Sequence, residues 1–181
     1  MQKYIASIFS VLVLAFMMSC SDSSEEFASS VINRADVETT PGFTWFEMKV
    51  SMYSPNADVV AQIADAAGDT TLGFYFFAAP ACSCDSLQDI FPNTVKCLDN
   101  AGISTSRQHF VAMLDETAEN PLGSEIFHID NLPEIFIAKN GLPVYSFADS
   151  FRVRNSAANS NPLISKVTVE EMLLEALQSL K

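Results

Sequence analysis

Along the first half of the chain, the spacing of apolar residues changes from that of strands to that of helices and back. In residues 46–52 apolar side chains alternate with polar ones, the period-two pattern of a half-buried strand. Residues 56–68 place apolar side chains on one face of a helix, and the unbroken apolar run at 72–79 is typical of a central strand covered on both faces. A second helix is expected over 85–100, bent at Pro92.

The second half contains one clear hairpin. Residues 134–138 and 144–147 are predicted strands on either side of Asn140-Gly141, a dipeptide favoured in two-residue β-turns. Pro143 has no N–H to donate to a neighbouring strand, so we expect the second strand to lie at the edge of the sheet.

The remaining segments complete the order of elements. A strand is predicted at 109–114 and a loop, with at most a short helix, at 116–129, whereas residues 149–166 are polar and carry no regular pattern. The last helix begins at Thr168, which forms a capping-box pattern with Glu171 ahead of apolar residues at helical spacing.

The predicted order is therefore β-α-β-α-β-(α)-β-β-α. Strand–helix–strand units at the front favour parallel pairing, and the hairpin adds an antiparallel edge. We expect an α/β fold, in which a mixed β-sheet is flanked by helices on both faces.

The N-terminus has the pattern of an export signal. Lys3 precedes an apolar core at 4–18, which is short for a membrane-spanning helix, and Cys20 follows shortly after. This arrangement resembles a bacterial lipoprotein signal, although Met17 and Met18 depart from the usual residues before the cysteine.

The lipoprotein resemblance implies that residues 1–19 are removed and that Cys20 carries a firm lipid anchor to the membrane. The protein would then lie in the cell envelope, at its periplasmic face or at the cell surface. An ordinary secretory signal cleaved nearby, with Cys20 as an incidental thiol, is the alternative. We expect residues 20–41, rich in Ser, Asp and Glu, to form a flexible acidic tether, and residues 42–181 to form one domain.

Charge narrows the choice of partners. The 181-residue chain has a formal net charge of −12, and loss of Lys3 with the signal would take it to −13. Nucleic acids and anionic membrane surfaces attract clustered Lys and Arg, so this acidity argues against nucleic acid as a partner.

The candidate chemistry belongs to Cys82 and Cys84, one residue apart where the apolar run ends and the second helix begins. Free N–H groups at a helix N-terminus stabilise a thiolate, whereas the neighbouring Asp85 opposes this effect. A disulfide between residues so close needs a bent backbone, and strained, exposed disulfides exchange readily. The pair therefore favours exchange chemistry over a structural bridge. Cys97, further along the same helix, is expected to be a small buried residue.

Leu132-Pro133 stands just before the hairpin, and the cysteine pair follows the second strand. Together with the order of elements, these features resemble the thioredoxin-like superfamily, most closely over residues 72–147. The resemblance implies a β-α-β-α-β-β-α core, a cis peptide bond before Pro133, and a groove at Leu132 and Pro133 that binds extended client peptides beside the cysteines. It also implies a thiol–disulfide oxidoreductase that acts on client protein disulfides through Cys82 and Cys84, without a cofactor.

Departures from the family pattern leave the roles of the thiols open. No Trp precedes them, and the acid that the family buries in the preceding strand is absent, since residues 74–77 are aromatic. The spacing to Pro92 matches the family if Cys84 is the nucleophile, with Leu87 in the place of the second cysteine. In the other register Cys82 is the nucleophile and Cys84 resolves the mixed disulfide.

Two other functions stay open. Cys82 and Cys84 with His109 or His128 would suit Cu(I), which prefers soft thiolate ligands, whereas no cluster has the spacing of a zinc finger. The missing Trp and acid favour instead a non-catalytic binding module in which Cys82–Cys84 is an inert bridge.

Overall fold

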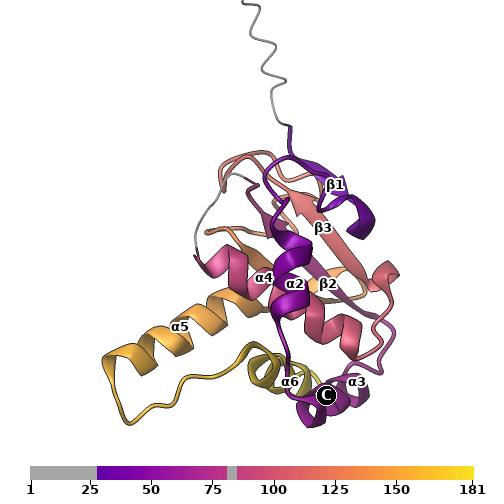
Figure 1. Ribbon diagram of the computed structural model, residues 1–181. Helices are drawn as coiled ribbons and strands as arrows, with labels where there is room; N and C mark the ends of the chain where they lie inside the picture. The colour runs from indigo at the N-terminus through magenta and orange to yellow at the C-terminus, as the bar shows by residue number, and fades with distance from the viewer. Residues whose placement is uncertain (1–27, 81–84) are drawn as a thin grey trace, which may run out of the picture.

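The computed structural model describes residues 28–80 and 85–181, which form an α/β fold around one five-stranded mixed sheet (Figure 1). The strands are β1 (Ser30–Ile32), β2 (Leu72–Ala78), β3 (Gln108–Ala112), β4 (Glu134–Lys139) and β5 (Leu142–Ser146). The helices are α2 (Phe46–Met52), α3 (Ala57–Ala66), α4 (Asp85–Asn100), α5 (Phe147–Ser160) and α6 (Val169–Ser179), with 3-10 helices η1 (Arg34–Asp36) and η2 (Thr105–Arg107). Within these described ranges, every helix is too short or too polar to cross a membrane.

β2 occupies the centre of the sheet, whose strand order is β1-β3-β2-β4-β5. β2 and β3 are parallel, with α4 between them in the chain, whereas β4 pairs antiparallel with both β2 and β5. The aromatic side chains of Phe74, Phe76 and Phe77 are buried along β2. The predicted central strand, the helix that follows it and their parallel unit are confirmed.

Two local sequence signals are also confirmed. Asn140 and Gly141 have φ angles of 53° and 80°, and a type I′ turn between β4 and β5 requires positive φ at both residues. β5 is an edge strand, as Pro143 predicted. At the start of α6, Thr168 Oγ1 accepts a hydrogen bond from Glu171 N, and the Glu171 carboxylate accepts one from Thr168 N.

The prediction of a strand at 46–52 is wrong, because these residues form α2. Phe46 and Val50 are buried, while Met48 and Met52 are 56% and 72% exposed. Residues four apart share a face in a helix and in a strand alike, so seven residues of alternation do not distinguish the two structures.

The first strand lies instead inside the stretch expected to be a tether. β1 pairs antiparallel with β3. The strand–helix–strand order at the start of the chain had instead predicted a first strand that pairs in parallel. η1 follows β1, and Val37 beyond it is fully buried. Residues 30–41 therefore belong to the folded domain, and a three-residue strand is too short to produce a recognisable pattern.

Helices cover only one face of the sheet in the described part of the chain. Alternate residues of β2, β3 and β4 pack there against the buried residues of all five α-helices, which we call the first core. On the opposite face, Phe77, Val111 and Phe136 pack against Phe127 and Leu132 from the segment between β3 and β4, which we call the second core. The expectation of helices on both faces is corrected: a loop segment takes the place of a second helical layer.

α5 lies largely within the polar stretch for which the sequence predicted no element. It buries only Phe147, Ala148 and Ala158, so no continuous apolar stripe marks it. Its first turns pack against β4, and it extends away from the sheet at the side of α4 and α6 (Figure 1).

Replacing Phe46 tests the assignment of α2. Phe46 is fully buried, so Phe46→Ala is expected to lower the free energy of unfolding by about 3–5 kcal/mol. Met48→Ala, at an exposed position, should change it by no more than about 0.5 kcal/mol. Urea unfolding of both variants measures the difference. A large loss in both would contradict the helix, because a strand would place these two residues on the same buried face.

Candidate functional site

The pairing of β2 with β4 defines the end of the sheet that carries the candidate site. Phe77 pairs with Glu134 in antiparallel register, so Pro133, the residue before Glu134, lies beside the end of β2 at Ala78. α4 begins at Asp85 and returns the chain to the start of β3, since β3 is parallel to β2. The end of β2, the start of α4 and the start of β4 are thus gathered at the same end of the sheet.

The predicted bend before β4 is present. The peptide bond between Leu132 and Pro133 is cis, as predicted. Pro133 is buried, and Leu132 is half-buried against the second core. The bend is therefore anchored by packing on the face of the sheet that the loop segment covers.

The predicted sites at Cys82, Cys84 and Cys20 lie outside the described residues. Pro80 and Asp85, the described residues on either side of the first two, fix the points between which that short segment runs. Both points belong to the same end of the sheet as the bend.

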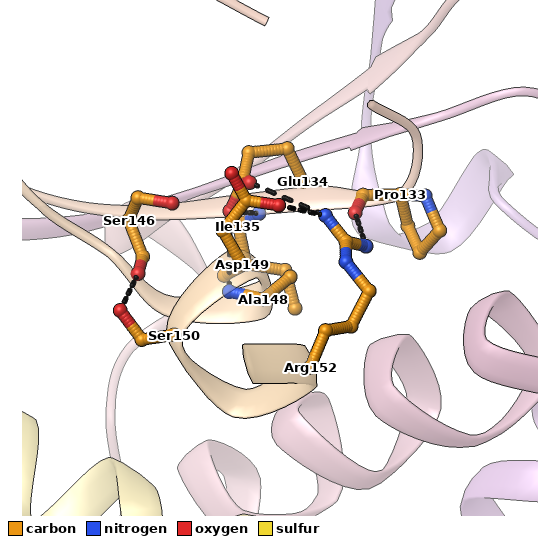
Figure 2. Close-up of polar contacts among 8 residues, drawn as sticks. All are labelled: Pro133, Glu134, Ile135, Ser146, Ala148, Asp149, Ser150 and Arg152. Carbon is orange, nitrogen blue, oxygen red and sulfur yellow. Dashed lines mark hydrogen bonds and ion pairs between the residues drawn. The ribbon is translucent and has the colours of Figure 1, made fainter. Parts of the chain in front are cut away.

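A buried carboxylate follows the bend directly. The side chain of Glu134 is only 3% exposed, and its Oε1 accepts hydrogen bonds from the backbone N–H groups of Ile135 at 2.8 Å and Ala148 at 3.1 Å. Arg152 of α5 lies 3.6 Å from the other carboxylate oxygen and donates a 2.7 Å hydrogen bond to the carbonyl of Pro133 (Figure 2). A buried charge is thus paired and hydrogen-bonded, as burial requires.

Burial raises the pKa of Glu134 above its usual range. The nearby Asp149 carboxylate acts in the same direction, whereas the hydrogen bond from Ile135 N and the charge of Arg152 favour the ionised form. Burial outweighs the contacts that favour the ionised form, because it removes the carboxylate from water.

Glu134 is a buried acid that the sequence did not predict. In β2, where the thioredoxin-like pattern would bury one, Phe74, Phe76 and Phe77 fill the interior. The acid lies instead on the neighbouring strand β4. Its signal in the sequence is a single charged residue at the head of the apolar run 134–138.

A close backbone contact supports Pro80. Gly42 has a φ of +92°, and a Cβ placed on it would lie 2.6 Å from both Cβ and the carbonyl oxygen of Pro80. The carbonyl of Gly42 also accepts a 2.8 Å hydrogen bond from Nε1 of Trp45, the chain's single Trp. No Trp stands directly before the thiols in the sequence, yet in the fold Trp45 contacts Gly42, which in turn contacts Pro80, two residues before Cys82.

The two histidines occupy different surroundings. His109 stacks on Tyr75 with ring centroids 4.3 Å apart, and the pair lies three residues before the end of β2, about 10 Å along the strand. Burial lowers the pKa of His109. His128 is exposed and lies 3.1 Å from Asp130. Among the side chains that the structure describes, no three His, Cys, Asp or Glu are grouped to hold a metal ion.

Cys97 is fully buried in α4, which confirms the prediction of a small buried residue. Burial raises the pKa of its thiol. A thiol that stays protonated and sealed from solvent is a poor nucleophile, so Cys97 is not a candidate for thiol chemistry.

Comparisons with known proteins add no relative: no family model, curated protein or solved structure matches the chain.

Gly42→Ala and Gly102→Ala form a matched pair that tests the contact with Pro80. Both glycines have positive φ, so each substitution carries a backbone cost of about 1–2 kcal/mol. A Cβ at Gly102 meets no atom within 4 Å, whereas at Gly42 it meets Pro80. We expect Gly42→Ala to lower the free energy of unfolding by about 1–3 kcal/mol more than Gly102→Ala. Equal losses in urea unfolding would rule out the tight approach.

A titration of stability tests the burial of Glu134. Because its pKa is raised above the ordinary 4.5, the folded state binds this proton more tightly than the unfolded chain. The contribution of Glu134 to stability is therefore full below about pH 4.5 and declines as the pH rises through the folded pKa. Glu134→Gln keeps an acceptor oxygen but cannot titrate. The unfolding free energy of the wild type minus that of Glu134→Gln should fall with pH, and a flat or rising difference contradicts this.

Proposed function

We propose that the chain is a thioredoxin-like thiol–disulfide oxidoreductase, tethered to the cell envelope by a lipid on Cys20. Cys82 and Cys84 exchange disulfides with client proteins, and Leu132 and Pro133 align the client strand. The observation that carries the proposal is the register of β2 with β4, which sets the Leu132–Pro133 bend beside the strand that leads into the cysteine pair.

Described residues stand on either side of the cysteine pair in the sequence. Cys84 is bonded to Asp85, the first residue of α4, and Cys82 stands two residues beyond Pro80. The free N–H groups in the first turn of α4 are then available to stabilise a thiolate.

The reaction follows from two thiols in reach of each other. The thiolate of one cysteine attacks a sulfur of the client disulfide, forms a mixed disulfide and releases the other client sulfur as a thiolate, which takes up a proton. The second cysteine then attacks the mixed disulfide. The client leaves as a dithiol and Cys82–Cys84 becomes a disulfide, so two electrons have passed from the protein to the client. A dithiol donor returns the pair to the reduced state.

A non-catalytic binding module is the second candidate, and one observation favours it. The buried positions of β2 before the cysteines hold Phe74, Phe76 and Phe77, so that strand offers no carboxyl to exchange a proton with the thiols. In this reading the bend still binds an extended peptide, and Cys82–Cys84 is an inert bridge.

Single-cysteine variants separate the two candidates. We expect residues 21–181 to reduce a client disulfide, and Cys82→Ser and Cys84→Ser each to abolish turnover. The variant that retains the nucleophile should accumulate a mixed disulfide that mass spectrometry detects, because it lacks the resolving thiol. Cys97→Ala, which removes a buried thiol, should leave turnover unchanged.

Three results would count against the oxidoreductase. A Cys82–Cys84 reduction potential below about −300 mV without turnover indicates the inert bridge. Stoichiometric Cu(I) uptake lost in either serine variant, again without turnover, indicates a copper carrier. Full turnover in both serine variants would exclude the pair from the chemistry.

A further inference from the structure

The guanidinium of Arg152 joins acceptors from two different elements. It donates a hydrogen bond to the carbonyl of Pro133 at 2.7 Å, and lies 3.6 Å from the carboxylate of Glu134. It also pairs with Asp149, one turn earlier in α5. Figure 2 shows the planar group between these carboxylates and the Pro133 carbonyl. A planar cation with several donors in fixed directions orients the groups that it binds.

Two hydrogen bonds connect the start of β4 with α5, and α5 is the donor in both. The carboxylate of Glu134 accepts a hydrogen bond from Ala148 N in the first turn of α5, where Ser146 provides no side-chain cap. Arg152, one turn further along, donates to the residue before Glu134. Because the helix N-terminus favours a negative charge, Glu134 also stabilises the start of α5. The two ties hold the head of β4 and the first turns of α5 as one unit.

The hydrogen bond from Arg152 to the Pro133 carbonyl connects the start of α5 to the Leu132–Pro133 bend. The peptide plane of this carbonyl adjoins that of Leu132–Pro133, so a donor that holds the carbonyl also restrains the backbone of Leu132. The side chain of Arg152 is 26% exposed and that of Glu134 is 3% exposed, so Arg152 reaches from the surface of the protein to a buried carboxylate. We call the contacts of Arg152 with Glu134 and the Pro133 carbonyl the clamp.

We propose that Arg152 is a positioning residue, which holds the Pro133 carbonyl and thereby sets the orientation of the Leu132 backbone. This inference rests on the function proposed above, in which that backbone aligns the client strand. Arg152 acts through Pro133 and does not touch the reacting sulfurs. Its loss weakens client binding and leaves the exchange step itself unchanged.

Arg152 has a second effect that the experiment must separate from positioning. It compensates the buried charge of Glu134, so its removal also lowers stability. Arg152→Met removes both effects. Adding Glu134→Gln removes the buried charge and keeps an acceptor for the N–H groups of Ile135 and Ala148, but it restores no donor to Pro133. The double variant therefore recovers stability without recovering the clamp.

The variants are made in the full-length chain, with Arg154→Gln as the matched control. Arg154 lies in the same helix but pairs with Glu175 of α6 at the surface. We expect Arg152→Met to raise the KM for a client disulfide by about five- to tenfold, the range that corresponds to the net contribution of one ordinary hydrogen bond, with kcat within about twofold. In Arg152→Met/Glu134→Gln the urea midpoint returns toward the wild-type value while KM stays raised. Arg154→Gln changes neither quantity.

Two readouts keep the outcomes distinct. If KM recovers together with stability in the double variant, Arg152 only neutralises Glu134 and the proposal fails. The amide NMR signals of Asn131 and Leu132 report the bend without any client. They should shift in both Arg152→Met proteins and not in Arg154→Gln, and unshifted signals overturn the positioning role. If the wild type turns over no client while these signals shift as expected, the oxidoreductase function fails and the positioning of the bend by Arg152 stands.

Discussion

The antiparallel pairing of β2 with β4 is the constraint on which the rest of the site depends. β2 is the central strand, and its buried aromatic side chains pack on both faces, so a one-residue shift in register would move each of them into the opposite core, whose partners do not fit it. With the register fixed at Phe77 opposite Glu134, the bend at Pro133 lies beside the end of β2. The segment with Cys82 and Cys84 leaves from the same strand end.

Burial of Glu134 has consequences well beyond its own position. A carboxylate sealed inside the fold requires a cation and hydrogen-bond donors, and these come from α5, through Arg152 and Ala148. A helix with few buried apolar residues is thereby given a defined place next to β4. The same cation reaches the Pro133 carbonyl. The electrostatic requirement of one buried acid thus links α5, a helix that the sequence did not predict, to the candidate binding bend.

The sequence predicted those parts of the fold in which local pattern and tertiary packing agree. The apolar run of β2, the helix at Asp85–Asn100, the turn at Asn140-Gly141 and the bend at Pro133 each carry a signal within a few residues. β1 and α2 were not recoverable, because three residues are too few for a period and alternation over seven residues suits helix and strand alike. The partnership of Glu134 and Arg152 joins residues far apart in the chain, so no local pattern indicates it.

The most direct measurement of the central claim is the distance from the sulfurs of Cys82 and Cys84 to the ring of Pro133 in a crystal structure of the oxidised protein. We expect at least one sulfur to be open to solvent and within about 4 Å of the ring, in van der Waals contact. Two results would contradict the proposed site. Both sulfurs could lie more than about 10 Å from Pro133, a distance that three extended residues span, or both could be sealed from solvent.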